Sequence, residues 1–194
     1  MQPFAEPTKE IIEAAKNGNQ EAFKDIFYAY RSYAYNLIYK IAGHGNDHAD
    51  LLQDLFFQVY LSLKTFRGES SFKTWFHRIV VHVCTRRWRY QKAEKRAMSE
   101  QAVSYESVEN EIHDELSNHG EQFELKAMVE KALATLDDKH RVPLILNIYK
   151  EMNLTEISEI LEIPEGTVKS RLFTARKKVE EFLKEFYKEY YHEI

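Results

Sequence analysis

The sequence has few residues that break helices and too few cysteines for a disulfide. Its 194 residues include only 6 Gly and 4 Pro, which favours long helices. The single cysteine, Cys84, excludes an internal disulfide and any metal site made from several cysteines of this chain. No segment approaches the roughly 18 apolar residues of a transmembrane helix. Residues 1–19 also lack the basic start and apolar run of a signal peptide. We therefore expect an all-α protein of the cytoplasm.

Charge of one sign is missing from whole segments. The formal net charge of -4 argues against a protein that coats nucleic acid through bulk charge, but it allows local basic patches. Residues 64–96 hold ten basic and two acidic residues, 97–125 hold eight acids and no Lys or Arg, and 169–178 hold five basic residues and no acid. This order predicts two helical domains joined by an acidic linker. A solvated helix face is the alternative explanation of each basic run.

Apolar residues recur every three or four positions in the first half of the chain. The pattern predicts one helix over residues 21–43, ended by Gly43, and a second helix that Asp47 caps and that extends to about residue 66. The face of the second helix opposite its apolar stripe is polar and by default solvated; it carries Asp50, Gln53, Asp54 and Gln58.

A third helix is expected from about Phe72, and it ends in "RRWRYQK", where aromatic residues alternate with cations. Cations neutralise phosphates, and aromatic rings stack on unpaired bases for about 1–3 kcal/mol per base. Because a duplex hides its base faces, the mixture favours single-stranded or melted nucleic acid. The alternative is that the rings fill the core, which the apolar stripe favours for Trp75 and which stays open for Trp88.

The second half predicts a helix-turn-helix. One helix ends near Leu136, and Asp137 or Asp138 caps the next, with Pro143 in its opening turns. Thr155 is expected to cap a short helix, and "IPEG" forms the turn into a longer basic helix.

The longer helix has the proportions of one that enters the major groove. Phe173 lies off the apolar stripe, among the charges. The residues expected to meet base edges are Thr167, Lys169, Ser170 and Phe173, and those expected to reach phosphates or further bases are Arg171, Arg176 and Lys177. An ordinary helical hairpin with a charged face is the alternative.

Two stretches resemble a known family. "DLLQDLFFQVYLSLKTFRGESSFKTWFHRIVVHVCTRRWR" resembles the second conserved region of bacterial RNA polymerase sigma factors, and "LTEISEILEIPEGTVKSRLFTARKKV" resembles their fourth. Their order and spacing are similar to the extracytoplasmic-function (ECF) group of the sigma-70 family, which has only these two domains. The resemblance implies a region 2 helical bundle over residues 9–95, an acidic linker over 96–125 and a region 4 helix-turn-helix over 126–194.

The resemblance also implies partners. Region 2 of the family binds the clamp helices of the largest subunit of core RNA polymerase, which maps to Asp50, Gln53 and Asp54, and region 4 contacts the flap. The loop and helix that recognise the minus-ten element and hold a flipped base of the melted strand map to Arg67, Lys73, Arg78, His82, Arg86, Arg87, Trp88 and Arg89. The helix that reads the minus-thirty-five element as duplex maps to Thr167, Lys169, Ser170, Arg171, Phe173, Arg176 and Lys177. Family members are often held by an anti-sigma factor.

Several positions depart from the family pattern. The usual "DAEDL" reads "DHADL", which removes an acid from the polymerase-facing helix. Thr174 stands where many members have Arg, and His82 stands where many have Asn. These changes affect the polymerase contact, one DNA contact and the identity of the flipped base.

The function predicted from the sequence is that of a sigma factor with no catalytic residues, cofactor or metal. The runner-up is a helix-turn-helix transcription regulator whose first half senses a signal or dimerises. An enzyme is the third hypothesis, because His44 and His48 are four residues apart, a spacing that can place two metal ligands on one helix face. Gly45 and Asn46 favour a loop there, and Cys84 lies in no known nucleophile motif.

Overall fold

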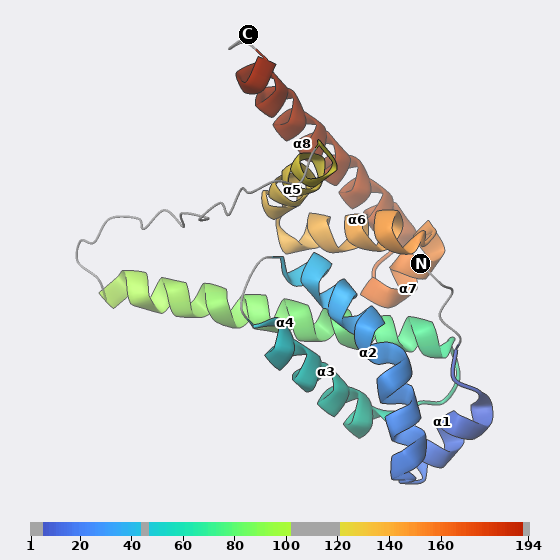
Figure 1. The fold of residues 1–194 in the computed structure, drawn as a ribbon. Coiled ribbons are helices and arrows are strands. Elements are labelled where there is room, and N and C mark those ends of the chain that lie inside the picture. Colours follow the sequence, from blue (N-terminus) through green and yellow to red (C-terminus); the bar gives the residue numbers. More distant parts are fainter. Residues whose placement is uncertain (1–5, 44–46, 102–120, 192–194) are drawn as a thin grey trace.

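The computed structural model describes residues 6–43, 47–101 and 121–191, and these residues form helices joined by short loops, with no strand among them (Figure 1). The helices are α1 (Lys9–Lys16), α2 (Gln20–Ala42), α3 (His48–Leu63), α4 (Phe72–Gln101), α5 (Glu121–Ala134), α6 (Asp138–Lys150), α7 (Leu154–Leu161) and α8 (Glu165–Tyr191). The all-α prediction is confirmed. Within these ranges, no helix combines the length and the apolar character that a membrane crossing needs. Most of the expected linker lies outside the described residues, although α4 extends to Gln101 and α5 begins at Glu121.

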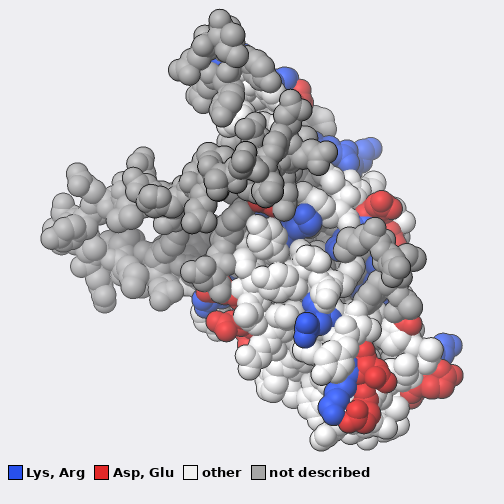
Figure 2. Space-filling model, in the orientation of Figure 1, with Lys and Arg blue, Asp and Glu red and all other residues white. Residues whose placement is uncertain are grey.

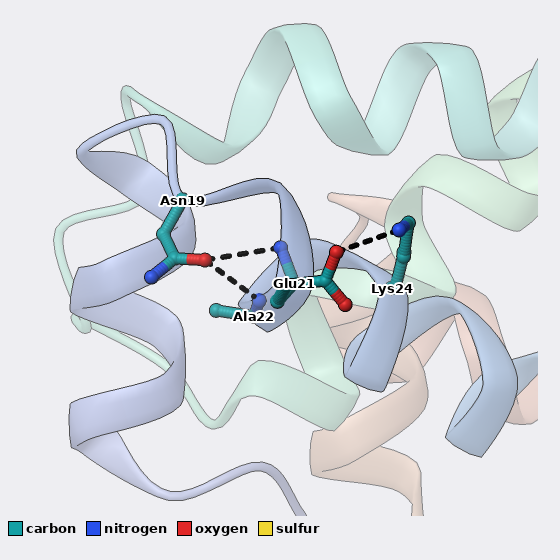
Figure 3. A network of polar contacts seen from close by, with 4 residues as sticks. All are labelled: Asn19, Glu21, Ala22 and Lys24. Carbon is teal, nitrogen blue, oxygen red and sulfur yellow. Dashed lines mark hydrogen bonds and ion pairs between the residues drawn. The ribbon is translucent and has the colours of Figure 1, made fainter.

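The start of α2 shows how local chemistry sets a helix boundary (Figure 3). The side-chain oxygen of Asn19 accepts hydrogen bonds from the backbone amides of Glu21 (3.0 Å) and Ala22 (3.1 Å), which have no partner inside the helix. Glu21 then pairs with Lys24 at 2.6 Å. Acidic and basic side chains are intermixed over α1 and the beginning of α2 in the lower part of Figure 2, so this end is an ordinary solvated surface.

The core of the first half forms where α2, α3 and α4 pack against one another. Tyr30 of α2 is fully buried and meets Phe76 edge to face, with ring centroids 4.7 Å apart, and Leu55 of α3 is also fully buried. Edge-to-face rings add about 0.5–1.5 kcal/mol beyond their burial. These contacts place the polar side of α3 on the outside and turn the polar residues of α4 away from this core.

The junction of α2 and α3 follows the prediction in position and departs from it in bonding. Gly43 ends α2 with a φ of 78°, a region that favours glycine, and its amide donates to the carbonyl of Tyr39 at 3.0 Å. Asp47 occupies the N-cap position of α3, but its side chain makes no cap hydrogen bond. Its carboxylate instead accepts from Nε of Arg87 on α4 at 2.9 Å.

The cap of α7 corrects the sequence prediction. Thr155 is not the N-cap, because Asn153 forms a capping box two residues earlier. The Asn153 side chain accepts from the amide of Glu156, and the Glu156 carboxylate accepts from the amide of Asn153, both at 2.9 Å. The reciprocal pair satisfies two amides at once, which a lone threonine does not. The spacing Asn-x-x-Glu was the signal in the sequence.

The cap of α6 is Asp137, one of the two candidates, and its carboxylate bonds to the His140 ring rather than to a helix amide. Pro143 lies in the second turn of α6, within the opening turns as predicted, but beyond the position where a missing N–H costs little. The helix begins at Asp138, so Pro143 is past the first four amides that lack helical partners, and its missing N–H leaves the carbonyl of Lys139 without the usual donor.

The two halves of the chain pack against each other. In Figure 1, α6 and α7 lie beside α2 and α4, and residue contacts join α2 to α6 and α4 to α7. The buried apolar residues of both halves form one continuous cluster. This packing decides which polar faces remain accessible.

Candidate DNA and polymerase interfaces

The first candidate interface is the outer side of α8. Pro164 starts this helix, because its carbonyl accepts from the amides of Thr167 (2.8 Å) and Val168 (3.1 Å). Val168, Leu172 and Ala175 are buried against the other helices of the second half. Helical geometry therefore turns Ser170, Phe173 and Lys177 to the opposite side, with Lys169 and Arg176 on one flank and Thr167 on the other.

The exposure of residues on the outer side of α8 agrees with the helical spacing of the sequence. Phe173 is 70% exposed, as its position off the apolar stripe predicts. Ser170 donates its hydroxyl to the carbonyl of Thr167 at 2.9 Å, which directs part of its hydrogen-bonding capacity inward. Arg176 donates to the side chain of Asn147 at 2.8 Å, and Lys177 lies 3.7 Å from a carboxylate oxygen of Glu181.

Arg171 is separated from the other predicted residues of α8. It is only partly exposed, and it lines a cleft of about 820 Å³ between the two halves of the chain. Its place on α8 is one turn from Val168 and Ala175, which explains why it faces the neighbouring helices rather than the solvent.

The second candidate interface is α4, and its predicted residues divide into groups. Arg78, His82 and Arg89 recur at four- and seven-residue spacing along one side and line the cleft. Nε of Arg78 donates to the backbone carbonyl of Glu159 on α7 at 2.9 Å. One side of α4 is therefore turned toward α7 and the start of α6.

Two other cations of α4 are turned toward α3. Arg86 lies 3.5 Å from the carboxylate of Asp54, and Arg87 pairs with Asp47. Both pairs are partly exposed, so each contributes little to stability. They hold the guanidinium groups near the surface of the helical bundle.

The aromatic residues and the loop before α4 complete this region. Trp75 is half-buried and meets the rings of Phe66 and Phe72, with centroids 5.0 Å and 5.2 Å away, so it is both a core residue and a wall of the cleft. Trp88 is also half-buried and packs against the core. Arg67 and Lys73 are exposed at the other end of α4.

The third candidate interface is the outer side of α3. Asp50, Gln53 and Asp54 are exposed there, opposite the buried stripe of the helix. Phe57, 58% exposed, and Leu61 continue the same side at three- and four-residue spacing, which sequence analysis did not single out. The sequence does indicate their exposure, because neither Phe57 nor Leu61 belongs to the apolar stripe that contains Leu55 and Leu63.

Several titratable groups near these surfaces are structural. His77 is fully buried; its Nδ1–H donates to the carbonyl of Lys73 and its Nε2 accepts from the hydroxyl of Tyr33, both at 2.6 Å. Burial lowers the pKa of His77 to about 4, so the ring is neutral at pH 7. Burial raises the pKa of the Cys84 thiol to about 12, which makes it a poor nucleophile.

Of the two histidines considered as metal ligands, the structure describes only His48. His48 is buried and its Nε2 lies 2.7 Å from the carbonyl of Gly43, so one ring nitrogen is held by the backbone. His44 lies outside the described residues. Among the residues that are described, no three His, Cys, Asp or Glu side chains gather in a way that could hold a metal ion.

The chain matches two family models, Sigma-70 region 2 over residues 26–94 and Sigma-70, region 4 over residues 126–179. It is 30% identical over 183 residues to the ECF RNA polymerase sigma factor SigW of Bacillus subtilis, covering 91% of this chain and 96% of that one. It is 28% identical over 177 residues to the ECF RNA polymerase sigma-E factor of Haemophilus influenzae, covering 88% and 92%.

Two solved structures share the fold. CnrH in complex with the cytosolic domain of CnrY superposes with a TM-score of 0.63 at 22% identity, covering 90% of this chain and 96% of that one. The sigma factor RpoE from Bartonella quintana, in complex with the anti-sigma factor NepR, gives 0.59 at 24% identity, covering 84% and 98%. The described helices, the two matched regions and the relatives agree, and the chain belongs to the ECF group of sigma-70 factors, the RNA polymerase subunits that direct the initiation of transcription.

Proposed function

We propose that the outer side of α8 reads the upstream, minus-thirty-five promoter element as duplex DNA. The observation that carries the proposal is the exposed surface on which Lys169, Ser170 and Phe173 stand together. A helix of this kind fits the major groove, where Lys can donate to guanine and an aromatic ring can contact a thymine methyl group. Arg176 and Lys177 lie beside this surface and are suited to phosphates, and Thr167 borders it on the other side. Arg171, which lines the cleft, belongs to the same proposed set.

The loop before α4 and α4 itself are proposed to bind the melted minus-ten strand. Cations along the helix neutralise phosphates, and the exposed ring of His82 and the half-buried ring of Trp88 supply flat groups for an unpaired base. Base flipping costs a few kcal/mol, which stacking and pocket contacts offset. The proposed residues are Arg67, Lys73, Arg78, His82, Arg86, Arg87, Trp88 and Arg89.

The outer side of α3 is proposed to bind the clamp helices of core polymerase. Asp50, Gln53 and Asp54 supply hydrogen-bond acceptors and charge, and Phe57 supplies an exposed aromatic ring beside them. Such an arrangement is typical of interfaces, in which aromatic residues are enriched at the centre and polar residues form the rim. The second half is proposed to contact the flap.

The proposed domain organisation is region 2 over residues 9–95, an acidic linker over 96–125 and region 4 over 126–194. The protein would act in the cytoplasm, where core polymerase and promoter DNA are found, and would carry out no chemistry itself. An anti-sigma factor is a further proposed partner, because RpoE of Bartonella quintana was solved with one, NepR.

The experiment is transcription of the organism's genomic DNA by core polymerase with and without the purified protein, followed by sequencing of the transcript 5′ ends. We expect new start sites that share two sequence elements at constant spacing. A protein that binds duplex sites but neither co-purifies with core polymerase nor changes the start sites would instead be a helix-turn-helix regulator, and the proposal would be wrong.

A further inference from the structure

The side chain of Asn147, near the end of α6, is bonded to two other parts of the second half. Its Nδ2 donates to the backbone carbonyl of Met152 at 2.9 Å, and its Oδ1 accepts from Nη2 of Arg176 on α8 at 2.8 Å. Met152 lies in the turn between α6 and α7, directly before the capping residue Asn153. One half-buried amide therefore connects α6, this turn and the helix proposed to enter the major groove.

The chemistry of the two partners fixes the orientation of this amide. A backbone carbonyl only accepts hydrogen bonds, and a guanidinium only donates them. If the amide group were turned over, its oxygen would face the carbonyl of Met152 and its nitrogen would face Arg176, and both bonds would be lost. The carbonyl of Met152 therefore directs the side-chain oxygen of Asn147 toward the guanidinium.

The turn that supplies this carbonyl is itself constrained. Glu151 ends α6 in the left-handed region, with a φ of 54°, and its amide donates to the carbonyl of Leu146. The amide of Met152 donates to the same carbonyl at 3.3 Å, and the Met152 side chain is buried. The acceptor that holds Arg176 is therefore attached to a well-determined part of the backbone.

Most of the hydrogen-bonding capacity of Arg176 remains available to a ligand. A guanidinium carries five N–H donors, and the bond to Asn147 uses one of them. The Arg176 side chain is exposed, and it lies on the same flank of α8 as Lys169, about two turns further along the helix. A free arginine loses rotamer freedom when it binds a phosphate, whereas an arginine that is already held loses less. The contact with Asn147 therefore prepares Arg176 for such a ligand.

A neutral partner leaves the charge of the arginine available. Asn147 accepts a hydrogen bond from Arg176 without bringing a negative charge, so the full positive charge can act on DNA. The neighbouring Lys177 differs in this respect, because its Nζ lies 3.7 Å from a carboxylate oxygen of Glu181, which offsets part of its charge. An amide thus orients the cation and does not compete with a phosphate for it.

We propose that Asn147 is a positioning residue of the upstream DNA interface, which holds the guanidinium of Arg176 where it meets a backbone phosphate of the minus-thirty-five duplex. The proposal rests on the assignment of α8 to duplex DNA and of Arg176 to a phosphate made above. A phosphate contact fixes the register of a helix in the groove and carries no base information itself. Loss of Asn147 should therefore weaken binding to all duplexes alike.

A double-mutant cycle in the full chain tests this role. Fluorescence anisotropy measures binding to duplexes that carry the minus-thirty-five element found by start-site sequencing, or a scrambled version of it. We expect Asn147→Ala to weaken binding about three- to tenfold on both, because the guanidinium must then be ordered at the moment of binding. In an Arg176→Ala background, Asn147→Ala should have no further effect. Asn36→Ala, which removes an exposed asparagine of α2, is the control.

The salt dependence of binding separates positioning from a general loss of structure. Arg176→Ala removes a phosphate contact and should reduce the slope of log K against log salt by about 0.9. Asn147→Ala should keep the parent's slope, because the cation still reaches the phosphate. Asn147→Asp loses the same bond to Met152 but pairs its carboxylate with Arg176, so its slope should fall as in Arg176→Ala. If Asn147→Ala and Asn147→Asp have equal slopes, Asn147 acts only through the fold and the proposal is wrong.

The single variant Arg176→Ala tests the underlying assignment. An unchanged affinity and salt slope in this variant would mean that Arg176 meets no phosphate, which would overturn both the proposed contact and the role of Asn147. A weaker Arg176→Ala in which Asn147→Ala still has its full effect would overturn the positioning role alone and leave the DNA interface standing.

Discussion

A carboxylate oxygen of Asp54 on α3 lies 3.5 Å from Nη2 of Arg86 on α4, and this pair joins the proposed polymerase-binding side to the proposed strand-binding side. Because both side chains are partly exposed, the pair is worth no more than about 1 kcal/mol. We expect Asp50→Lys with Asp54→Lys to abolish co-purification with core polymerase while changing the free energy of unfolding by less than about 1 kcal/mol. Asp25→Lys, an exposed change on α2, is the control. Retained polymerase binding in the double variant would contradict the assignment.

Lys169→Ala is expected to weaken binding to the upstream duplex by about 1–3 kcal/mol on the cognate sequence and by less on other sequences, because a base contact carries sequence information. Fluorescence anisotropy with cognate and scrambled duplexes measures both values. Lys184→Ala, on the same helix but paired with Glu180 at 2.5 Å and more than three turns away, is the control. Equal weakening on every sequence would make Lys169 a phosphate contact.

Trp88→Ala is expected to lower the free energy of unfolding by roughly 2 kcal/mol, since a half-buried indole loses part of what a fully buried one contributes. It should also reduce the formation of the open complex at temperatures where the variant remains folded. Chemical denaturation and permanganate reactivity of promoter thymines give the two measurements. Lower stability with unchanged promoter melting would assign the ring to the core alone.

The free energy of unfolding is expected to decrease as the pH is lowered, because of His77. Burial lowers the pKa of His77 from 6.5 to about 4, so the unfolded chain binds more protons between these values. The contribution is fully present above pH 6.5 and is lost as pH falls toward 4, about 3 kcal/mol in all. Urea unfolding at pH 7 and at pH 4.5 should show the decrease, and His77→Gln should make it smaller. An unchanged slope in that variant would exclude His77 as its source.

Local pattern accounts for much of this fold. The stop at Gly43 follows from a backbone angle that favours glycine, and the exposure of Phe173 follows from helical periodicity. The cap of α7 was misassigned to Thr155 because several residues that can cap a helix stand close together there. The glutamate three residues after Asn153 distinguishes it from Thr155, and the hydrogen bonds of the first turn agree.

The sequence by itself determined that the chain is helical, where most helices begin and end, and which side of each helix is polar, because these depend on residues within a few turns of one another. Tertiary structure alone decided what lies against each polar side. The carboxylate of Asp47 meets Arg87 rather than a helix amide, and Nζ of Lys40 on α2 lies over the ring of Tyr149 on α6. Contacts between residues so distant along the chain depend on how whole helices pack. Packing therefore decides that the Arg78 side of α4 faces α7 while the Phe173 side of α8 faces solvent.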